Sequence, residues 1–153
     1  MKIRVLWVGK TQEAWIRLGI DEYAARIRRY APLEIAEARE EKGAACEVMR
    51  DREGERLAKL VPRSARIVLL DEHGDGMTSP EFAGFIGRSR ENGNSDLVFV
   101  IGGAYGFSDS FRRKAEKVIS LSPMTFTHQM VRVFLLEQIY RGFTILNNEP
   151  YHH

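Results

Sequence analysis

Apolar and polar residues follow two different patterns along this chain, and each pattern predicts one kind of secondary structure. Residues 66–71 and 96–102 are short runs with apolar side chains at almost every interior position. Runs of this kind are typical of strands that are covered on both faces in a parallel sheet. Shorter apolar segments at 2–8, 33–35 and 118–121 predict three further strands.

Spacings of three and four residues between apolar positions predict the helices. Ile16, Ile20 and Ile27 lie on one face of a helix within residues 16–30. Residues 48–61 predict a second helix, which is highly charged and has few apolar anchors. The first of these helices is therefore the better defined of the two.

The chain carries its own start signals for a third helix. Either Thr78 or Ser79 can cap it, and Pro80 suits its first position. We expect this helix to run to about residue 92. A fourth helix, at 108–117, separates a glycine-rich turn from the last predicted strand.

The last helix begins near Thr127 and is apolar around almost its whole circumference, so it must be buried on several sides. Its apolar residues are Met130, Val131, Val133, Phe134, Leu135, Leu136, Ile139, Tyr140 and Phe143. The alternation of strands and helices predicts an α/β protein in which helices flank a mostly parallel sheet. Because its 153 residues contain no linker, repeat or low-complexity stretch, we expect a single domain over 1–153.

The charge balance gives no strong nucleic-acid signal for the chain as a whole, since 23 basic residues face 21 acidic ones. The basic residues nevertheless cluster in two places. One cluster holds Arg26, Arg28 and Arg29, and the other lies within residues 112–117. These clusters are either nucleic-acid-binding patches or solvated helix faces, and composition alone does not decide between them.

Cysteine usage and apolar run length exclude several protein classes. Cys46 is the only cysteine, so no internal disulfide can form, and no signal-peptide pattern follows Met1. We therefore expect a cytoplasmic protein. No apolar run approaches the roughly 20 residues that span a bilayer. The four histidines lack the spacing of a metal site, so neither a membrane nor a metal partner is expected.

Three predicted loops follow the carboxyl ends of strands, at 71–76, 102–106 and 122–126. Ligands of open α/β sheets bind outside those ends, so we expect the three loops to form one pocket. Gly102 and Gly103 would let the backbone approach a ligand closely, and the following Gly106 would allow a positive φ. The alternative is that these glycines serve turn geometry alone. The segment lacks the spacing of a dinucleotide or P-loop fingerprint.

Two longer segments near the end of the chain carry a resemblance to a known family. Residues 121–133, followed by 137–141 and by the terminal Tyr151 and His152, are similar to the C-terminal signature of the RlmH family of SPOUT-class RNA methyltransferases. Shorter matches elsewhere extend the resemblance over essentially the whole chain; they lie at 8–10, 21–23, 52–55, 69–71 and 100–103.

The resemblance implies a SPOUT fold whose C-terminal part threads through a loop as a trefoil knot. Periodicity does not reveal a knot, and knots are rare among folds. The family further implies S-adenosylmethionine as the cofactor, bound in the knot, and a homodimer that completes the sites. The implied reaction is methylation of N3 of a pseudouridine in 23S rRNA of the large ribosomal subunit.

The same resemblance implies the residues of the site. The cofactor pocket maps onto apolar walls and backbone groups, which suit an adenine ring and a methionine chain; its residues are Leu70, Gly102, Leu121, Ser122, Pro123, Met124, Thr125 and Phe126. The predicted catalytic residues are His128, Arg132, Tyr151 and His152. His128 and His152, with Glu137 as a further candidate, are the proton acceptors considered, and Arg132 would stabilise charge on a carbonyl oxygen.

Structural roles without any part in catalysis are also possible for these residues. His128 at a helix start is equally suited to capping or packing, and a terminal His152 and His153 pair is by default a frayed end. Two other functions also remain. One is a non-catalytic, ribosome-associated RNA-binding module that uses the basic clusters and the tyrosines Tyr23, Tyr30, Tyr105 and Tyr151. The other is a SPOUT methyltransferase for transfer RNA, which the small size of the chain disfavours.

Overall fold

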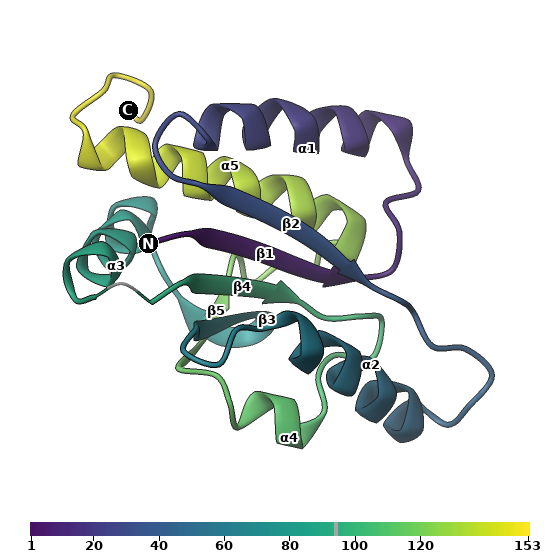
Figure 1. Cartoon of the computed structure of the whole chain (residues 1–153). Helices are drawn as coiled ribbons and strands as arrows, with labels where there is room; N and C mark the ends of the chain where they lie inside the picture. The colour runs from purple at the N-terminus through teal and green to yellow at the C-terminus, as the bar shows by residue number, and fades with distance from the viewer. Residues whose placement is uncertain (94) are drawn as a thin grey trace.

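The computed structural model describes residues 1–93 and 95–153. Strands and helices alternate through most of the chain (Figure 1). The elements are β1 (Ile3–Val8), α1 (Ala14–Ile27), β2 (Leu33–Ala38), α2 (Cys46–Leu60), β3 (Arg66–Gly76), α3 (Ser79–Glu91), β4 (Leu97–Ile101), α4 (Asp109–Arg112), β5 (Lys117–Ser120) and α5 (His128–Leu146).

The five strands form one parallel sheet in the order β2-β1-β4-β3-β5. Every residue of β4, at the centre of the sheet, is buried, as its continuous apolar run predicts. Helices α1, α3 and α5 cover one face, and α2 and α4 cover the other (Figure 1). The predicted α/β architecture is confirmed.

The caps of two helices follow from single side chains. Thr78 forms a capping box with Glu81 at the start of α3, and Thr127 accepts a hydrogen bond from the N–H group of Met130 at the start of α5. Caps of this type contribute about 1 kcal/mol each to stability. They fix where both helices begin, which places the loops that precede them.

Two predicted boundaries were wrong. The segment 71–76 was expected to be a loop, but it is the outer half of β3, which pairs again with β5 after a register shift between Leu70 and Asp75. A Cβ atom at Gly74 would lie 2.7 Å from the carbonyl carbon of Ile119, so only glycine allows this close approach of the strands. The helix expected at 108–117 is a single turn at α4.

Helix α5 packs against both α1 and α3. Glycines permit the close approach, because a Cβ atom at Gly19 would lie 3.2 Å from Val133 and one at Gly142 would lie 3.2 Å from Ile86. The predicted burial of this helix is confirmed for Leu135, Leu136, Ile139 and Phe143, among others, whereas Met130, Val131, Val133, Phe134 and Tyr140 are only partly buried. Among the described residues, no helix has the length and apolar character that crossing a membrane requires.

Candidate active site

A cleft of about 760 Å³ opens beside the middle of β3 and the carboxyl ends of β4 and β5. Most of the residues that line it come from 70–73, 101–107 and 120–128, and we call it the strand-end cleft. The segments 101–107 and 120–128 lie at and after the ends of β4 and β5, and 70–73 lies within β3, which is between those two strands in the sheet. The three segments that the sequence predicts to meet therefore do meet, but the first of them is strand and not loop.

The residues expected to bind a cofactor gather in this cleft, with the exception of Pro123. Leu70, Gly102, Leu121, Ser122, Met124, Thr125 and Phe126 all line it. Pro123 is exposed and lies outside the lining. The cleft therefore has an apolar part made of leucine, methionine and phenylalanine side chains, and backbone groups of two loops beside it.

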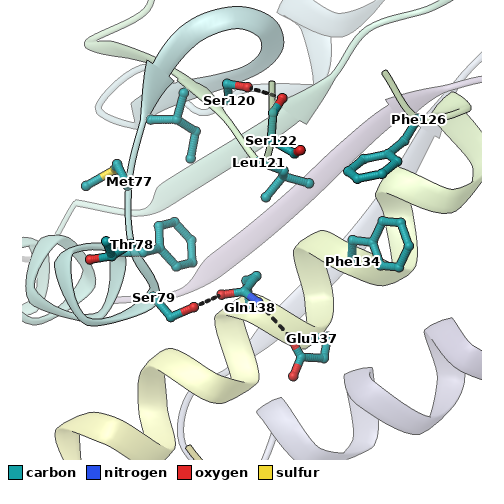
Figure 2. A pocket seen from close by; sticks show the side chains of 12 residues that line it. Met77, Thr78, Ser79, Ser120, Leu121, Ser122, Phe126, Phe134, Glu137 and Gln138 are labelled. Atoms are coloured by element: carbon teal, nitrogen blue, oxygen red, sulfur yellow. Dashed lines mark hydrogen bonds between the residues drawn. The ribbon is translucent and has the colours of Figure 1, made fainter. Parts of the chain in front are cut away.

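The loop 121–126 is held in place by its own hydroxyl groups. Ser120 donates to the carbonyl oxygen of Ser122 at 2.8 Å (Figure 2). Oγ of Ser122 accepts from the N–H group of Met124 at 3.0 Å. Thr125 donates to Oε2 of Glu72 at 2.6 Å, which links this loop to the outer half of β3. These bonds make the loop a firm wall of the cleft, whereas the Met124 side chain projects into solvent and is 74% exposed.

Residues 102–106 form a loop that we call the glycine loop, and neighbouring side chains leave no room for larger residues at two of its positions. A Cβ atom at Gly102 would lie 3.2 Å from the Phe107 ring, and one at Gly103 would lie 2.8 Å from Oε1 of Glu53. Gly106 has a positive φ of +78°, as expected from the sequence. The expectation that the missing side chains leave room for a ligand was wrong, because protein atoms occupy that side of the loop.

A charged end of the strand-end cleft was not foreseen from the sequence. Asp71 forms an ion pair with Arg112 and accepts a hydrogen bond from the N–H group of His73 at 2.9 Å. Burial by itself would raise the pKa of Asp71, but the bonds from His73 and Arg112 and the charge of Arg112 outweigh it and lower the pKa. Asp71 is therefore a permanent anion at neutral pH.

His128 lies at the first turn of α5 and lines the same cleft. Its side chain is exposed at the rim. Loss of hydration near the cleft, and then the positive charge of Arg132 one turn further along α5, lower the pKa of the imidazole. The neutral ring, which is able to accept a proton, is thus the form favoured at neutral pH.

Arg132 occupies the interior instead of the cleft. Its side chain is fully buried, donates to Thr11 Oγ1 and to the carbonyl oxygen of Val8 at 2.9 Å each, and lies over the Trp7 ring at 4.9 Å. Burial lowers the pKa of this guanidinium to about 10. These contacts tie the end of β1 to α5 and leave Arg132 no surface that a substrate could touch in the single chain.

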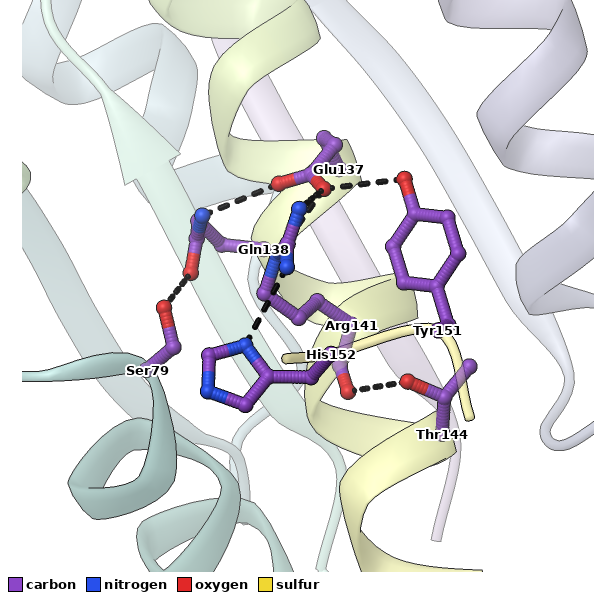
Figure 3. Close-up of polar contacts among 7 residues, drawn as sticks. All are labelled: Ser79, Glu137, Gln138, Arg141, Thr144, Tyr151 and His152. Atoms are coloured by element: carbon purple, nitrogen blue, oxygen red, sulfur yellow. Dashed lines mark hydrogen bonds and ion pairs between the residues drawn. The ribbon is translucent and has the colours of Figure 1, made fainter. Parts of the chain in front are cut away.

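The C-terminal tail is folded back onto α5. The Tyr151 hydroxyl donates to Oε1 of Glu137 at 3.0 Å (Figure 3). The Tyr151 ring packs edge-on against the Tyr140 ring, with 4.7 Å between their centroids. Arg141 contacts Nδ1 of His152 at 3.1 Å. Burial, followed by hydrogen bonds to neighbouring groups, raises the pKa of Tyr151. Tyr151 and His152 are therefore held in contact with α5 and are not a frayed end, which was the alternative that the sequence left open.

The single chain does not bring the tail and His128 together. His152 contacts Arg141, which lies about 20 Å from His128 along α5 at 1.5 Å per residue. Of the predicted catalytic residues, one therefore lies at the strand-end cleft, one lies in the interior, and Tyr151 and His152 lie at the far half of α5.

The chain matches known proteins over its whole length. A family model for predicted SPOUT methyltransferases matches residues 1–152. The chain belongs to the SPOUT methyltransferase family. Its relatives include the ribosomal RNA large subunit methyltransferase H proteins of Geotalea uraniireducens and Geobacter sulfurreducens, each 72% identical over 153 residues, with all of both chains covered. The corresponding protein of Trichlorobacter lovleyi is 59% identical, again over both full lengths.

Among solved structures, a probable methylase family protein from Haemophilus influenzae superposes with a TM-score of 0.59. The superposition covers 99% of this chain and 70% of that one, at 8% sequence identity. Such a match speaks for the fold alone. Together with the family model, it confirms the SPOUT fold. The family model and the relatives confirm the resemblance to the RlmH family that the C-terminal residues carried.

A second, smaller cavity of this SPOUT protein lies on the other side of the loop that follows β5. It measures about 230 Å³, lies between the start of α3 and α5, and shares Ser120, Leu121, Ser122 and Phe126 with the strand-end cleft (Figure 2). We call it the small cavity. No motif predicted it, because its walls come from segments that are far apart in the sequence.

A chain of hydrogen bonds runs from the small cavity to the tail. Ser79 donates to Oε1 of Gln138 at 2.7 Å, and Nε2 of Gln138 donates to Oε2 of Glu137 at 2.9 Å (Figure 3). The other oxygen of Glu137 accepts from Arg141 and Tyr151. Glu137 is thus the hub of the network, and both of its oxygens are engaged.

Proposed function

We propose that this protein is an S-adenosylmethionine-dependent methyltransferase that acts on N3 of a pseudouridine in 23S rRNA of the large ribosomal subunit. The observation that carries the proposal is the strand-end cleft, whose lining agrees with the cofactor residues that the family resemblance implies. Relatives named as ribosomal RNA large subunit methyltransferases, aligned over their full length, support the substrate class.

The residues of the cleft fit this cofactor. Its volume of about 760 Å³ falls within the range of roughly 300–1,000 Å³ that small-molecule sites occupy. Leu70, Leu121 and Phe126 provide apolar walls for a purine and an aliphatic chain, and the backbone of Gly102 provides polar groups between them. S-adenosylmethionine supplies a methyl group on a positively charged sulfur, so the protein mainly has to align the acceptor.

In this proposal, His128 accepts the proton that leaves N3 as the new N–CH₃ bond forms. Its position on the rim of the cleft and its lowered pKa support this role. The sulfur leaves as a neutral thioether, so the positive charge passes to the imidazole. Arg132 acts through His128, since its buried charge disfavours the protonated ring, and not through contact with substrate.

We further propose a homodimer in which the tail of one chain completes the active site of its partner. The tail is packed on α5, away from the His128 of its own chain, so Tyr151 and His152 would reach a base only across an interface. Exposed apolar residues beside α5 support such an interface: Trp15 is 58% exposed and Leu18 is 71% exposed on α1, which packs against α5.

The knot, the single domain over 1–153 and a cytoplasmic location belong to the same proposal. A knot would bring the 121–126 loop next to the outer half of β3. Thr125 donates a hydrogen bond to Glu72, so these two segments lie side by side, which supports the proposal. The family model, which matches residues 1–152 as one unit, supports the single domain. A substrate in the large ribosomal subunit supports the location.

Two measurements test the proposal. Calorimetric titration of the protein with S-adenosylmethionine should give saturable binding, and incubation with unmodified ribosomes should place one methyl group on a pseudouridine of 23S rRNA, mapped by a reverse-transcription stop. Absence of cofactor binding would favour the non-catalytic RNA-binding module. Transfer to tRNA with none to ribosomes would favour the tRNA methyltransferase.

A further inference from the structure

Glu53 is a buried carboxylate that the proposed mechanism does not use. It lies in α2, it is 5% exposed, and it stands against Gly103 of the glycine loop without being one of the residues that line the strand-end cleft. Burying a carboxylate costs free energy unless the group is paired or hydrogen-bonded. Its surroundings therefore indicate what it does.

Helix α2 touches the glycine loop and also Ser108, the residue that caps the turn after it. A Cβ atom at Gly103 would lie 2.8 Å from Oε1 of Glu53, and a Cβ atom at Gly54 would lie 2.7 Å from Oγ of Ser108. Ser108 in turn caps the α4 turn that follows the loop, where its Oγ accepts from the N–H group of Phe111 at 3.3 Å. Neighbouring residues of one helix thus support the start and the exit of the loop.

The position of the Glu53 side chain is itself fixed. Its Oε2 accepts a hydrogen bond from the N–H group of Glu41 at 3.1 Å. The side chain of Glu41 is held by ion pairs to Arg52 and Arg56, and Arg56 also donates to the carbonyl oxygen of Arg39 at 3.0 Å. The segment before α2 is therefore bonded to α2, and Glu53 is clamped between this segment and the loop.

From this geometry we propose that Glu53 is a positioning residue for the cofactor. Its carboxylate sets the path of the glycine loop and so the distance between the Gly102 backbone and the 121–126 loop on the opposite wall. The inference rests on the proposed function, because it takes the glycine loop to be a wall of the cofactor site. Glu53 touches no reacting atom; it acts through Gly103.

A double-mutant cycle with Gly103 tests this proposal. The variants are Glu53→Ala, Gly103→Ala and the pair combined, and Glu55→Gln is the control because that glutamate is exposed on the same helix. The dissociation constant of S-adenosylmethionine is measured by calorimetry, and the KM for the cofactor and the kcat of methyl transfer are measured separately. Unfolding midpoints report any general loss of stability.

We expect each single variant to weaken cofactor binding about tenfold, through KM more than kcat. The double variant should bind more tightly than the product of the two losses predicts, since removing the carboxylate of Glu53 makes room for the methyl group that Gly103→Ala introduces. Glu55→Gln should bind like wild type. If Glu53→Ala fails to fold, Glu53→Asp replaces it, because aspartate is one methylene shorter and keeps the charge. The loss in the double variant is then again compared with the product of the two single losses.

The outcomes separate the two proposals. Wild-type protein that binds S-adenosylmethionine, together with losses that simply multiply in the double variant, overturns the role of Glu53 and leaves the proposed function standing. Wild-type protein that binds no S-adenosylmethionine overturns both. Losses that follow the unfolding midpoints, with KM unchanged in the folded variants, also overturn the positioning role.

Discussion

The hydroxyl group of Tyr151 donates a hydrogen bond to Oε1 of Glu137, at 3.0 Å, and so joins the end of the chain to the middle of α5. The same oxygen accepts from Arg141, which contacts His152. Glu137 was a candidate proton acceptor on the basis of sequence. Its engaged oxygens give it a different task, which is to hold the two tail residues in one arrangement.

Replacing Glu137 with glutamine should therefore slow methyl transfer to ribosomes without weakening cofactor binding. The amide is a poorer acceptor than the carboxylate for the Tyr151 hydroxyl and for Arg141, which contacts His152, so the tail is held less firmly. We expect a loss of about tenfold or more in kcat, with the cofactor dissociation constant within a few-fold of wild type. Glu55→Gln is the matched exposed control, and an unchanged kcat in Glu137→Gln would contradict this assignment.

Deletion of residues 151–153 should abolish or greatly slow methyl transfer, because it removes both Tyr151 and His152 from the proposed composite site. Cofactor affinity should remain within a few-fold of wild type, since the strand-end cleft lies at the other half of α5. Light scattering shows whether the truncated protein is still a dimer. Full activity of a dimeric truncation would rule out a catalytic role for the tail.

Gly102→Val should weaken cofactor binding by at least about tenfold. Its side chain would meet the Phe107 ring, which a Cβ atom alone would approach to 3.2 Å, so the glycine loop has to shift toward the cleft. Gly76→Ala is the control, because a Cβ atom there meets no atom of the described residues within 4 Å, its two chain neighbours aside. Wild-type affinity for S-adenosylmethionine in Gly102→Val would mean that the loop is not a wall of the cofactor site.

The pH dependence of methyl transfer should report His128. The folded protein lowers the pKa of this imidazole from its ordinary value of 6.5, so the neutral, proton-accepting form persists to a lower pH than in a free histidine. Activity should be full at neutral pH and should fall as the pH drops through the lowered pKa.

His128→Gln should remove this acidic limb and slow transfer by about 10²- to 10⁴-fold, the usual contribution of a general base. The pH profile of kcat is the measurement, and His73→Gln serves as the control because His73 is an exposed histidine of the same cleft. If the acidic limb of the pH profile remains in His128→Gln, a group other than His128 accepts the proton.

Sequence patterns predicted the fold well where local signals and burial agree. The apolar run of β4 and the Thr78 cap of α3 both appear where they were expected, because strand burial and capping depend on neighbouring residues. The outer half of β3 was missed, since polar residues at 71–76 indicate a loop and their pairing with β5 depends on a register shift far along the chain.

The candidate site was predicted only in part, for a similar reason. The loop at 122–126 was predicted from its position after a strand, and the resemblance to the family added Leu121 and the roles of the loop and of His128. The burial of Arg132 was not predicted, because the pattern of one helix does not reveal that Trp7, Val8 and Thr11 surround its side chain. The partner of Gly103 was missed as well, since Glu53 lies about 50 residues away in sequence and meets it only in the folded chain.

The loop after β5 is a partition with a space on each side, because Ser120, Leu121, Ser122 and Phe126 face both the strand-end cleft and the small cavity. An inhibitor need not compete with S-adenosylmethionine for the larger space. A compact apolar compound bound in the small cavity, against Phe82 and Phe134, would contact the loop after β5 from the side opposite the cofactor and displace it. Its effect would persist at saturating cofactor, which distinguishes it from analogues of the cofactor itself.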